Sequence, residues 1–130
     1  MAEYEVRPEY CYTKGDTWVC RLADGTIRFG ITDYAQKKLK EIEYLNLPEP
    51  GEAVCQGESL GEVESKKSVS DLMSPLTGIV LELNNAAEDD PGLLNRDPYG
   101  AGWILSLSCS DYETQAAGLL DAETYRQIRQ

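Results

Sequence analysis

Short runs rich in apolar residues are separated by turn signals in the first third of the chain. Two such runs, residues 18–22 and 27–31, flank Asp24-Gly25, a dipeptide suited to a tight turn that needs positive φ. Two strand-like runs on either side of such a turn are typical of paired antiparallel strands. We therefore predict a β-hairpin over residues 18–31.

The period changes to that of a helix directly after this hairpin. Thr32 is a good N-terminal cap, and the apolar residues that follow fall near helical spacing, with lysines on the polar side. We expect this helix to end near Glu41 or Ile42. Extended structure resumes over residues 44–47, until Pro48-Glu49-Pro50-Gly51 forces a turn, because proline fixes φ and glycine supplies a permissive position.

Strand-like runs recur on both sides of residues 65–68, which places Lys66 and Lys67 at the tip of a second hairpin. A further strand is expected over residues 78–83. Residues 84–102 are rich in turn signals, and residues 103–107 return to strand. The last twenty residues predict helix, with Asp121 as its N-terminal cap.

Together these elements predict a mainly β fold with short helices, a small sandwich or barrel with an internal helix and a C-terminal helix. The chain has 130 residues, of which 42% are apolar, enough for one hydrophobic core but not comfortably for two. We expect a single domain over residues 1–130, with residues 1–17 as an N-terminal extension and residues 111–130 as a C-terminal helical segment. The pattern leaves the order of strand pairing open.

The charge balance narrows the classes of partner. The formal net charge is −11, and the chain has no histidine. This argues against nucleic acid as a partner and removes the side chain most often used for proton transfer near neutral pH. An acidic surface suits docking onto basic faces of larger proteins, and it serves solubility equally well.

The N-terminal residues 1–8 lack an apolar run long enough for a signal peptide or a membrane span. We expect a cytoplasmic location and no membrane partner. In that reducing compartment the four cysteines should be free thiols, and because none of them forms a C-x-x-C pair we predict no metal site. The cysteines are Cys11, Cys20, Cys55 and Cys109.

A lysine at an exposed tight turn is accessible to a modifying enzyme, whereas a lysine in mid-strand has its backbone tied into a ladder. Two adjacent lysines in a loop are, by themselves, more often solvated charges than a modification site. The surrounding segment favours modification here: Val63-Glu64-Ser65-Lys66-Lys67-Ser68-Val69-Ser70-Asp71, followed by Ser74-Pro75-Leu76-Thr77-Gly78-Ile79-Val80, resembles the lipoylation region of the glycine cleavage system H protein family. The modified lysine of that family falls on Lys67.

The resemblance covers roughly residues 18–130, because other family segments occur in the expected order. It implies a barrel-sandwich hybrid fold and lipoic acid amide-linked to Lys67, which shuttles an aminomethyl group and electrons between partner enzymes. The implied partners are glycine decarboxylase, aminomethyltransferase and dihydrolipoamide dehydrogenase, and the chain would be a carrier and not an enzyme. The matching segments are Gly30-Ile31-Thr32-Asp33-Tyr34-Ala35-Gln36, Leu47-Pro48-Glu49-Pro50-Gly51, Asn95-Arg96-Asp97-Pro98-Tyr99-Gly100 and Gly102-Trp103.

The resemblance also implies that Glu64 and Asp71 are recognised by the enzyme that attaches lipoate, whether a lipoate ligase or an enzyme of lipoyl synthesis. The alternative is that both are merely solvent-facing strand ends, and the resemblance favours recognition. Lys66 stands where the family usually has an apolar residue, so it is a second candidate for modification beside Lys67. We interpret Lys66 as a bystander.

Two features depart from the family pattern. The family commonly has a histidine two residues ahead of the tryptophan, where this chain has Asp16, and four cysteines are many for this family. Both resemble the H-like lipoate-binding proteins that serve a heterodisulfide-reductase-like complex in cytoplasmic sulfur oxidation. In that alternative the arm carries sulfur and Cys11, Cys20 or Cys55 takes part, although small buried cysteines explain the count as well. A non-lipoylated scaffold is a third hypothesis.

Overall fold

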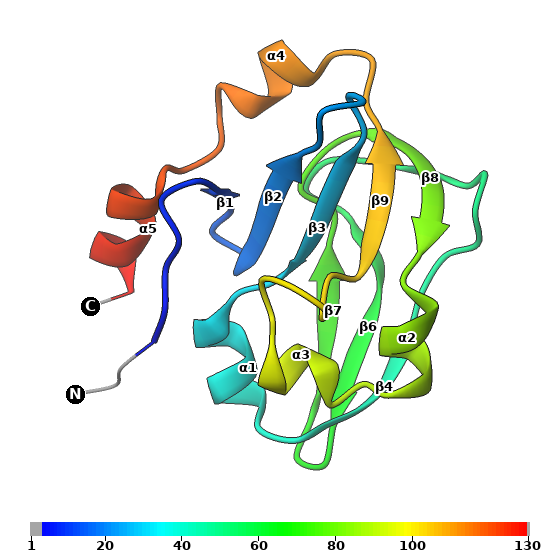
Figure 1. Ribbon diagram of the computed structural model, residues 1–130, viewed down its shortest axis with the longest axis vertical. Helices are drawn as coiled ribbons and strands as arrows, with labels where there is room; N and C mark the ends of the chain where they lie inside the picture. Colours follow the sequence, from blue (N-terminus) through cyan, green and yellow to red (C-terminus); the bar gives the residue numbers. More distant parts are fainter. Residues whose placement is uncertain (1–3, 130) are drawn as a thin grey trace.

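The structure, a computed structural model, describes residues 4–129 and folds them into two antiparallel sheets with short helices around them (Figure 1). The predicted class, mainly β with short helices, is confirmed. In chain order the elements are β1 (Cys11–Tyr12), β2 (Thr17–Arg21), β3 (Ile27–Ile31), α1 (Asp33–Leu39), β4 (Ile42–Asn46), β5 (Ala53–Val54), β6 (Ser59–Ser65), β7 (Val69–Met73), β8 (Gly78–Leu83), α2 (Asn85–Asp89), α3 (Leu93–Arg96), β9 (Leu105–Ser108), α4 (Tyr112–Ala116) and α5 (Ala122–Ile128).

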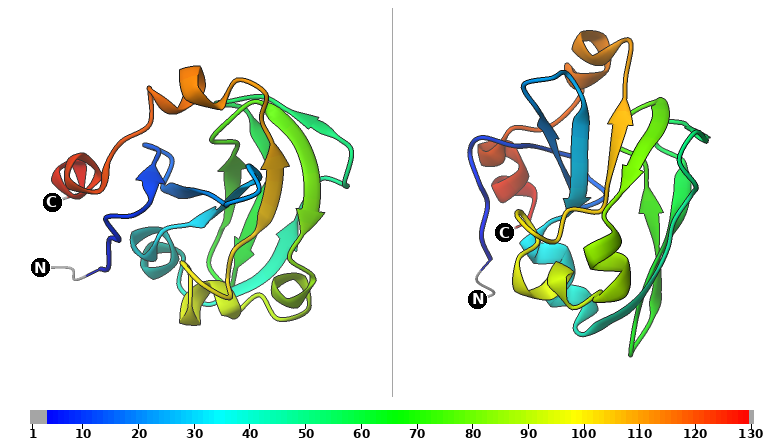
Figure 2. Two further views of the ribbon diagram at one scale, coloured as in Figure 1. Left: turned by 45° about the horizontal axis from the view of Figure 1, so that its top comes forward. Right: turned by 45° about the vertical axis from the view of Figure 1, so that its right-hand side comes forward.

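The two sheets share one hydrophobic core. The larger sheet has the strand order β1-β2-β3-β9-β8-β5, and the smaller sheet has the order β4-β6-β7. Phe29 and Leu107 of the larger sheet and Val63 and Leu72 of the smaller sheet belong to the same buried cluster. The sheets therefore face each other across this core, as the two views of Figure 2 show.

The first hairpin and the helix after it form as predicted. β2 and β3 pair in antiparallel register around Gly25, whose φ is 88°. Thr32 caps α1 by accepting a hydrogen bond from the Ala35 N–H at 3.2 Å. The helix ends at Leu39, earlier than predicted, because Lys40 adopts a φ of 68° and turns the chain into β4.

The segment predicted to consist of turns contains two short helices, α2 and α3, of five and four residues. Helices of about one turn are too short to show the periodic apolar stripe on which sequence prediction depends. Between α2 and α3 the chain turns at Asp90, and α3 packs Leu94 into the core.

The prediction of helix through the last twenty residues is wrong between Ala117 and Leu120. Two helices, α4 and α5, replace one, and Leu120 lies between them in extended backbone. The cause is β1, an unpredicted strand within the N-terminal segment: the Tyr12 N–H donates to Leu120 O at 2.8 Å, and the Leu120 N–H donates to Tyr12 O at 2.7 Å. The predicted cap of α5 is confirmed, because Asp121 Oδ1 accepts the Thr124 N–H at 2.8 Å.

A second cluster, largely aromatic, fixes α5 against the outside of the larger sheet. Trp18 and Tyr12 are buried there, with the Tyr12 ring stacked on Tyr125 at a centroid distance of 4.7 Å. The Tyr125 hydroxyl lies 2.7 Å from Thr32 Oγ1 and donates to Asp16 Oδ1 at 2.8 Å, and Arg129 Nε donates to the same oxygen at 2.7 Å. Burial raises the pKa of Tyr125, so its hydroxyl stays protonated and able to donate.

We predict that Tyr125→Phe lowers the free energy of unfolding by about 1–3 kcal/mol, because it leaves the fully buried Thr32 hydroxyl and the Asp16 carboxylate short of a partner. Urea unfolding measures this loss. Tyr112→Phe is the matched control, since within residues 4–129 the Tyr112 hydroxyl makes no hydrogen bond, and its expected effect is within about 0.5 kcal/mol. An equal loss in both variants would contradict this account of α5.

Candidate functional site

The β6–β7 hairpin ends in a two-residue turn that presents both lysines. The Ser65 N–H donates to Ser68 O at 2.8 Å, so Lys66 and Lys67 occupy the two central positions of the turn. Both are exposed. Figures 1 and 2 show the tip of this hairpin extending beyond the neighbouring elements, away from the body of the protein.

Ser65 holds the backbone of this turn. Its side chain is buried, and its Oγ accepts hydrogen bonds from the N–H groups of Lys67 at 3.3 Å and Ser68 at 3.2 Å. The same hydroxyl lies 3.2 Å from Ser68 O, to which it donates. One buried hydroxyl thus supplies partners that the strand ladder does not provide at the tip, which orders the backbone of Lys67 and leaves its side chain in solvent.

The two lysines differ in their contacts. The Lys66 N–H donates to Glu41 O at 3.1 Å, and Lys66 Nζ lies 3.5 Å from Glu41 Oε2. Within residues 4–129 the Lys67 side chain forms no ion pair or hydrogen bond. An exposed ion pair contributes only about 0–1 kcal/mol, but together with the backbone contact it directs Lys66 toward the start of β4. Lys66 is thus held by Glu41, whereas the Lys67 side chain has no such contact within the described part of the chain.

The two residues predicted to be recognised by a modifying enzyme lie on one surface, which we call the outer face of the smaller sheet. Glu64 pairs in register with Val69, and Glu62 pairs with Asp71, so all four side chains point away from the core. Asp71 Oδ1 also lies 3.3 Å from Ser59 Oγ, which donates to it. Among the exposed residues of this face are Tyr44, Asn46, Glu62, Glu64, Val69 and Asp71.

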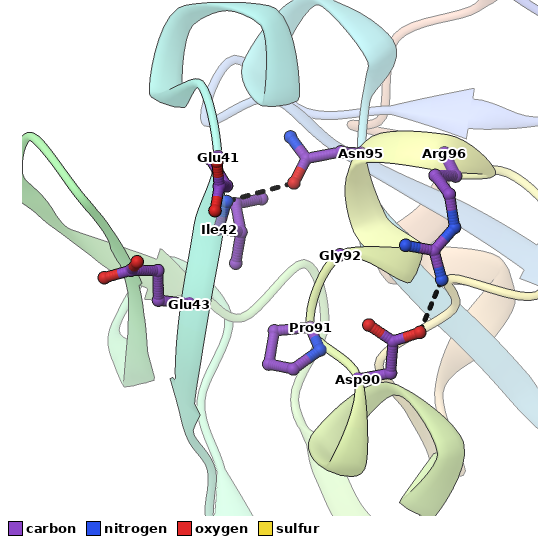
Figure 3. A pocket seen from close by; sticks show the side chains of 8 residues that line it. All are labelled: Glu41, Ile42, Glu43, Asp90, Pro91, Gly92, Asn95 and Arg96. Atoms are coloured by element: carbon purple, nitrogen blue, oxygen red, sulfur yellow. Dashed lines mark hydrogen bonds and ion pairs between the residues drawn. The ribbon is translucent and has the colours of Figure 1, made fainter.

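An open notch of about 690 Å³ lies on the other side of β4, between its first residues and the turn from α2 to α3 (Figure 3). Asn95 fixes its wall by accepting the Ile42 N–H at 3.0 Å and donating to Lys40 O at 2.7 Å. Arg96 pairs with Asp90 on the wall formed by α2 and α3, which neutralises the cation (Figure 3). The hydrogen bonds of Asn95 therefore anchor the start of β4, next to Glu41, which contacts Lys66.

The cysteines are dispersed over the structure. Cys11 packs against the main core and Cys20 against the aromatic cluster, on the opposite face of the larger sheet. Burial raises the pKa of both thiols, only partly offset at Cys20 by the nearby Arg28. Cys55 is exposed in the turn before β6, and the length of β6, about 20 Å, separates that turn from the lysine tip. These positions do not bring the three thiols together at one site.

Within residues 4–129, no group of three or more histidine, cysteine, aspartate or glutamate side chains is arranged to hold a metal ion. The described helices also include none with the length and apolar composition needed to cross a membrane.

Two residues that shape the tip, Ser65 and Glu41, were not predicted from the sequence. Ser65 carries a detectable signal, because a serine two positions before a turn residue often accepts its N–H. Glu41 carries none, since it lies 25 positions before Lys66 in the chain and meets it only through the pairing of β4 with β6.

Comparisons with known proteins agree with this geometry. The family model described as "Glycine cleavage H-protein" matches residues 10–130. A glycine cleavage system H protein of Mycobacterium avium is 48% identical over 125 residues, which cover 94% of this chain and 95% of that protein. A probable glycine cleavage system H protein of Thermococcus gammatolerans is 46% identical, over 96% of this chain and 92% of that protein. The crystal structure of a glycine cleavage system H protein from Mycobacterium marinum matches with a TM-score of 0.86 and 40% identity, over 95% of this chain and 98% of that one.

We predict that Cys55 reacts first when the native protein is treated with iodoacetamide at pH 8, and that Cys11 and Cys20 react more slowly. A raised pKa means a smaller thiolate fraction at a given pH, and burial also limits access of the reagent to both residues. Peptide mapping over time measures the three rates. Alkylation of Cys11 or Cys20 as fast as that of Cys55 would overturn this assignment.

Proposed function

The chain belongs to the glycine cleavage H-protein family, whose members are lipoyl carriers, and on this premise we propose that it carries lipoic acid in amide linkage on Lys67. The observation that carries the proposal is the hairpin tip. Lys67 is exposed, its backbone is held by Ser65, and its side chain has no partner within residues 4–129. An amide bond requires a free amine at an accessible position, and this residue supplies it.

The contacts of Lys66 support Lys67 as the attachment point. A modifying enzyme that took up Lys66 would have to separate its ammonium group from Glu41 and work against the backbone contact to the same residue. Lys67 requires neither step. Each of these contacts of Lys66 contributes little free energy. The preference for Lys67 therefore depends on these contacts together with the position of each lysine in the turn.

In this proposal the chain's own residues position the cofactor and catalyse nothing. When bound, lipoic acid supplies a dithiolane that accepts electrons and an aminomethyl group. A long arm rooted at a projecting tip raises the local concentration of its reactive end inside each partner. The partners we propose are glycine decarboxylase, aminomethyltransferase and dihydrolipoamide dehydrogenase, and the proposed location is the cytoplasm.

We also propose that Glu64 and Asp71 guide the enzyme that attaches lipoate, a lipoate ligase or an enzyme of lipoyl synthesis. Both carboxylates are exposed on the outer face of the smaller sheet, and Glu64 lies two positions before Lys66 in the chain. Complementary charge on a partner speeds encounter and fixes its orientation. A basic surface approaching the tip would meet these groups.

The sulfur-carrier alternative finds no support. The three relatives described above match over most of the chain and carry glycine cleavage names. The raised pKa values of Cys11 and Cys20 disfavour thiolate chemistry, and Cys55 lies at the opposite end of β6 from the tip. The departure at Asp16 also has a local cause, because Tyr125 and Arg129 both bind its carboxylate.

We predict that Lys67→Arg abolishes the lipoyl mass increment when the protein is incubated with a lipoate–protein ligase, ATP and lipoate, whereas Lys66→Arg retains it. Both substitutions keep the positive charge, so the variants differ only in which amine remains. Intact-mass spectrometry gives the readout. Full modification of Lys67→Arg, mapped to Lys66, would show that the attachment site is assigned to the wrong lysine.

A further inference from the structure

Two large apolar side chains are exposed beside the lysine tip. Tyr44 is 57% exposed and Val69 is 55% exposed, and they are the most exposed large hydrophobic residues within residues 4–129. Tyr44 pairs in register with Glu64 on β6, and Glu64 pairs with Val69 on β7. The three side chains therefore form one row across the smaller sheet, about 10 Å wide, with a carboxylate between two apolar groups.

The backbone explains why Tyr44 faces solvent. The register of β4 against β6 shifts between Ile42 and Tyr44, so Ile42 and Leu45 enter the core while Tyr44 lies outside it. Such a bulge re-aims the side chains that follow it. Val69 begins β7 only two residues after Lys67. The row thus lies directly behind the turn.

The charges of this face are of one sign. Glu62 and Asp71 form the next row, and the three strands of the sheet contain no lysine or arginine. An exposed apolar pair within a field of carboxylates fits a partner whose surface has an apolar hollow bordered by basic side chains.

We propose that this row, Tyr44-Glu64-Val69, is a docking surface for the enzyme that forms the lipoyl amide, with Tyr44 and Val69 as its apolar anchors. The inference rests on the proposed modification of Lys67 and deepens it. It differs from recognition by the carboxylates because apolar burial would supply binding free energy, whereas exposed charges mainly affect encounter and orientation.

The distance from the turn to the reacting atom indicates which partner enzyme uses this row. The amide forms at Lys67 Nζ, at the end of a four-carbon stem, so the attaching enzyme must enclose the turn itself and cover the strand ends behind it. Enzymes that act on the far end of the arm are separated from the turn by the arm's length. They can bind elsewhere on the protein while the end of the arm reaches their active sites. Contact with the row next to the turn is therefore obligatory for the attaching enzyme alone.

The test measures steady-state lipoylation by a purified lipoate–protein ligase with ATP and lipoate, using the complete unmodified chain as the varied substrate. Tyr44→Thr is expected to raise KM for the chain about tenfold and Val69→Thr about threefold, with kcat little changed, because loss of an anchor removes binding that is equal in ground and transition states. Threonine, like tyrosine, valine and isoleucine, is favoured in strands, so each substitution suits the strand at its position. Ile79→Thr is the matched control, because Ile79 is 41% exposed on β8, in the other sheet. The KM for this variant should equal the KM for the unsubstituted chain.

Carboxylate variants separate charge from apolar contact. Glu64→Gln and Asp71→Asn should raise KM at low salt, and this effect should shrink as salt is added, while the effect of Tyr44→Thr persists. Thermal unfolding of each variant shows whether the fold is retained.

The outcomes discriminate among the hypotheses. An unchanged KM for a folded Tyr44→Thr variant, with Lys67 still modified, overturns the docking proposal alone. Unchanged lipoylation combined with a raised KM in glycine decarboxylation assigns the row to another partner and also overturns it. Failure of the unsubstituted chain to be modified at Lys67 counts against the proposed function itself.

Discussion

The register of the β6–β7 hairpin decides both the core of the smaller sheet and the position of the two lysines at its tip. Along β6, Val63 and Ser65 point inward while Glu62 and Glu64 point outward. A slip by one residue would expose Val63 and bury Glu64, because side chains alternate with a period of two. It would also move the Ser65 hydroxyl away from the Lys67 N–H, so the requirement for a buried core and the geometry of the tip impose the same register.

The hairpin packs on the larger sheet through the main core, and the aromatic cluster lies on the opposite face of that sheet. The main core joins both sheets, and α5 closes the outside of the larger one through Tyr125 and Arg129. Both bind Asp16, which adopts a φ of 66°. The residue that departs from the family pattern at this position therefore belongs to a local network between β2, α1 and α5. Its hydrogen bonds hold the C-terminal helix against the larger sheet.

Much of this arrangement was predictable from local signals in the sequence. The turn at Gly25, the cap at Thr32 and the lysine tip each depend on residues adjacent in the chain, and each prediction is confirmed by the observed backbone. Features that depend on residues far apart were missed. Leu120 leaves helical structure because Tyr12 pairs with it, and Glu41 meets Lys66 because β4 lies beside β6. No pattern within either segment indicates its distant partner.

The distinction between Lys66 and Lys67 likewise depends on a contact between residues far apart in the chain. The segment from Val63 to Asp71 resembles a lipoylation region but contains two adjacent lysines. Only the fold distinguishes Lys66, which is held by Glu41, from Lys67, whose side chain has no partner within residues 4–129. Likewise, Tyr44 and Val69 become one surface only when β4 and β7 flank β6. Sequence motifs identify the chemistry, and the sheet arranges the groups around it.

The most direct measurement is the intact mass of the protein purified from its native cells, followed by mapping of the peptide that contains both lysines. Our account predicts a lipoyl adduct on Lys67 and an unmodified Lys66. An unmodified Lys67 in cells that lipoylate other proteins would contradict the account and favour a scaffold that has kept the fold.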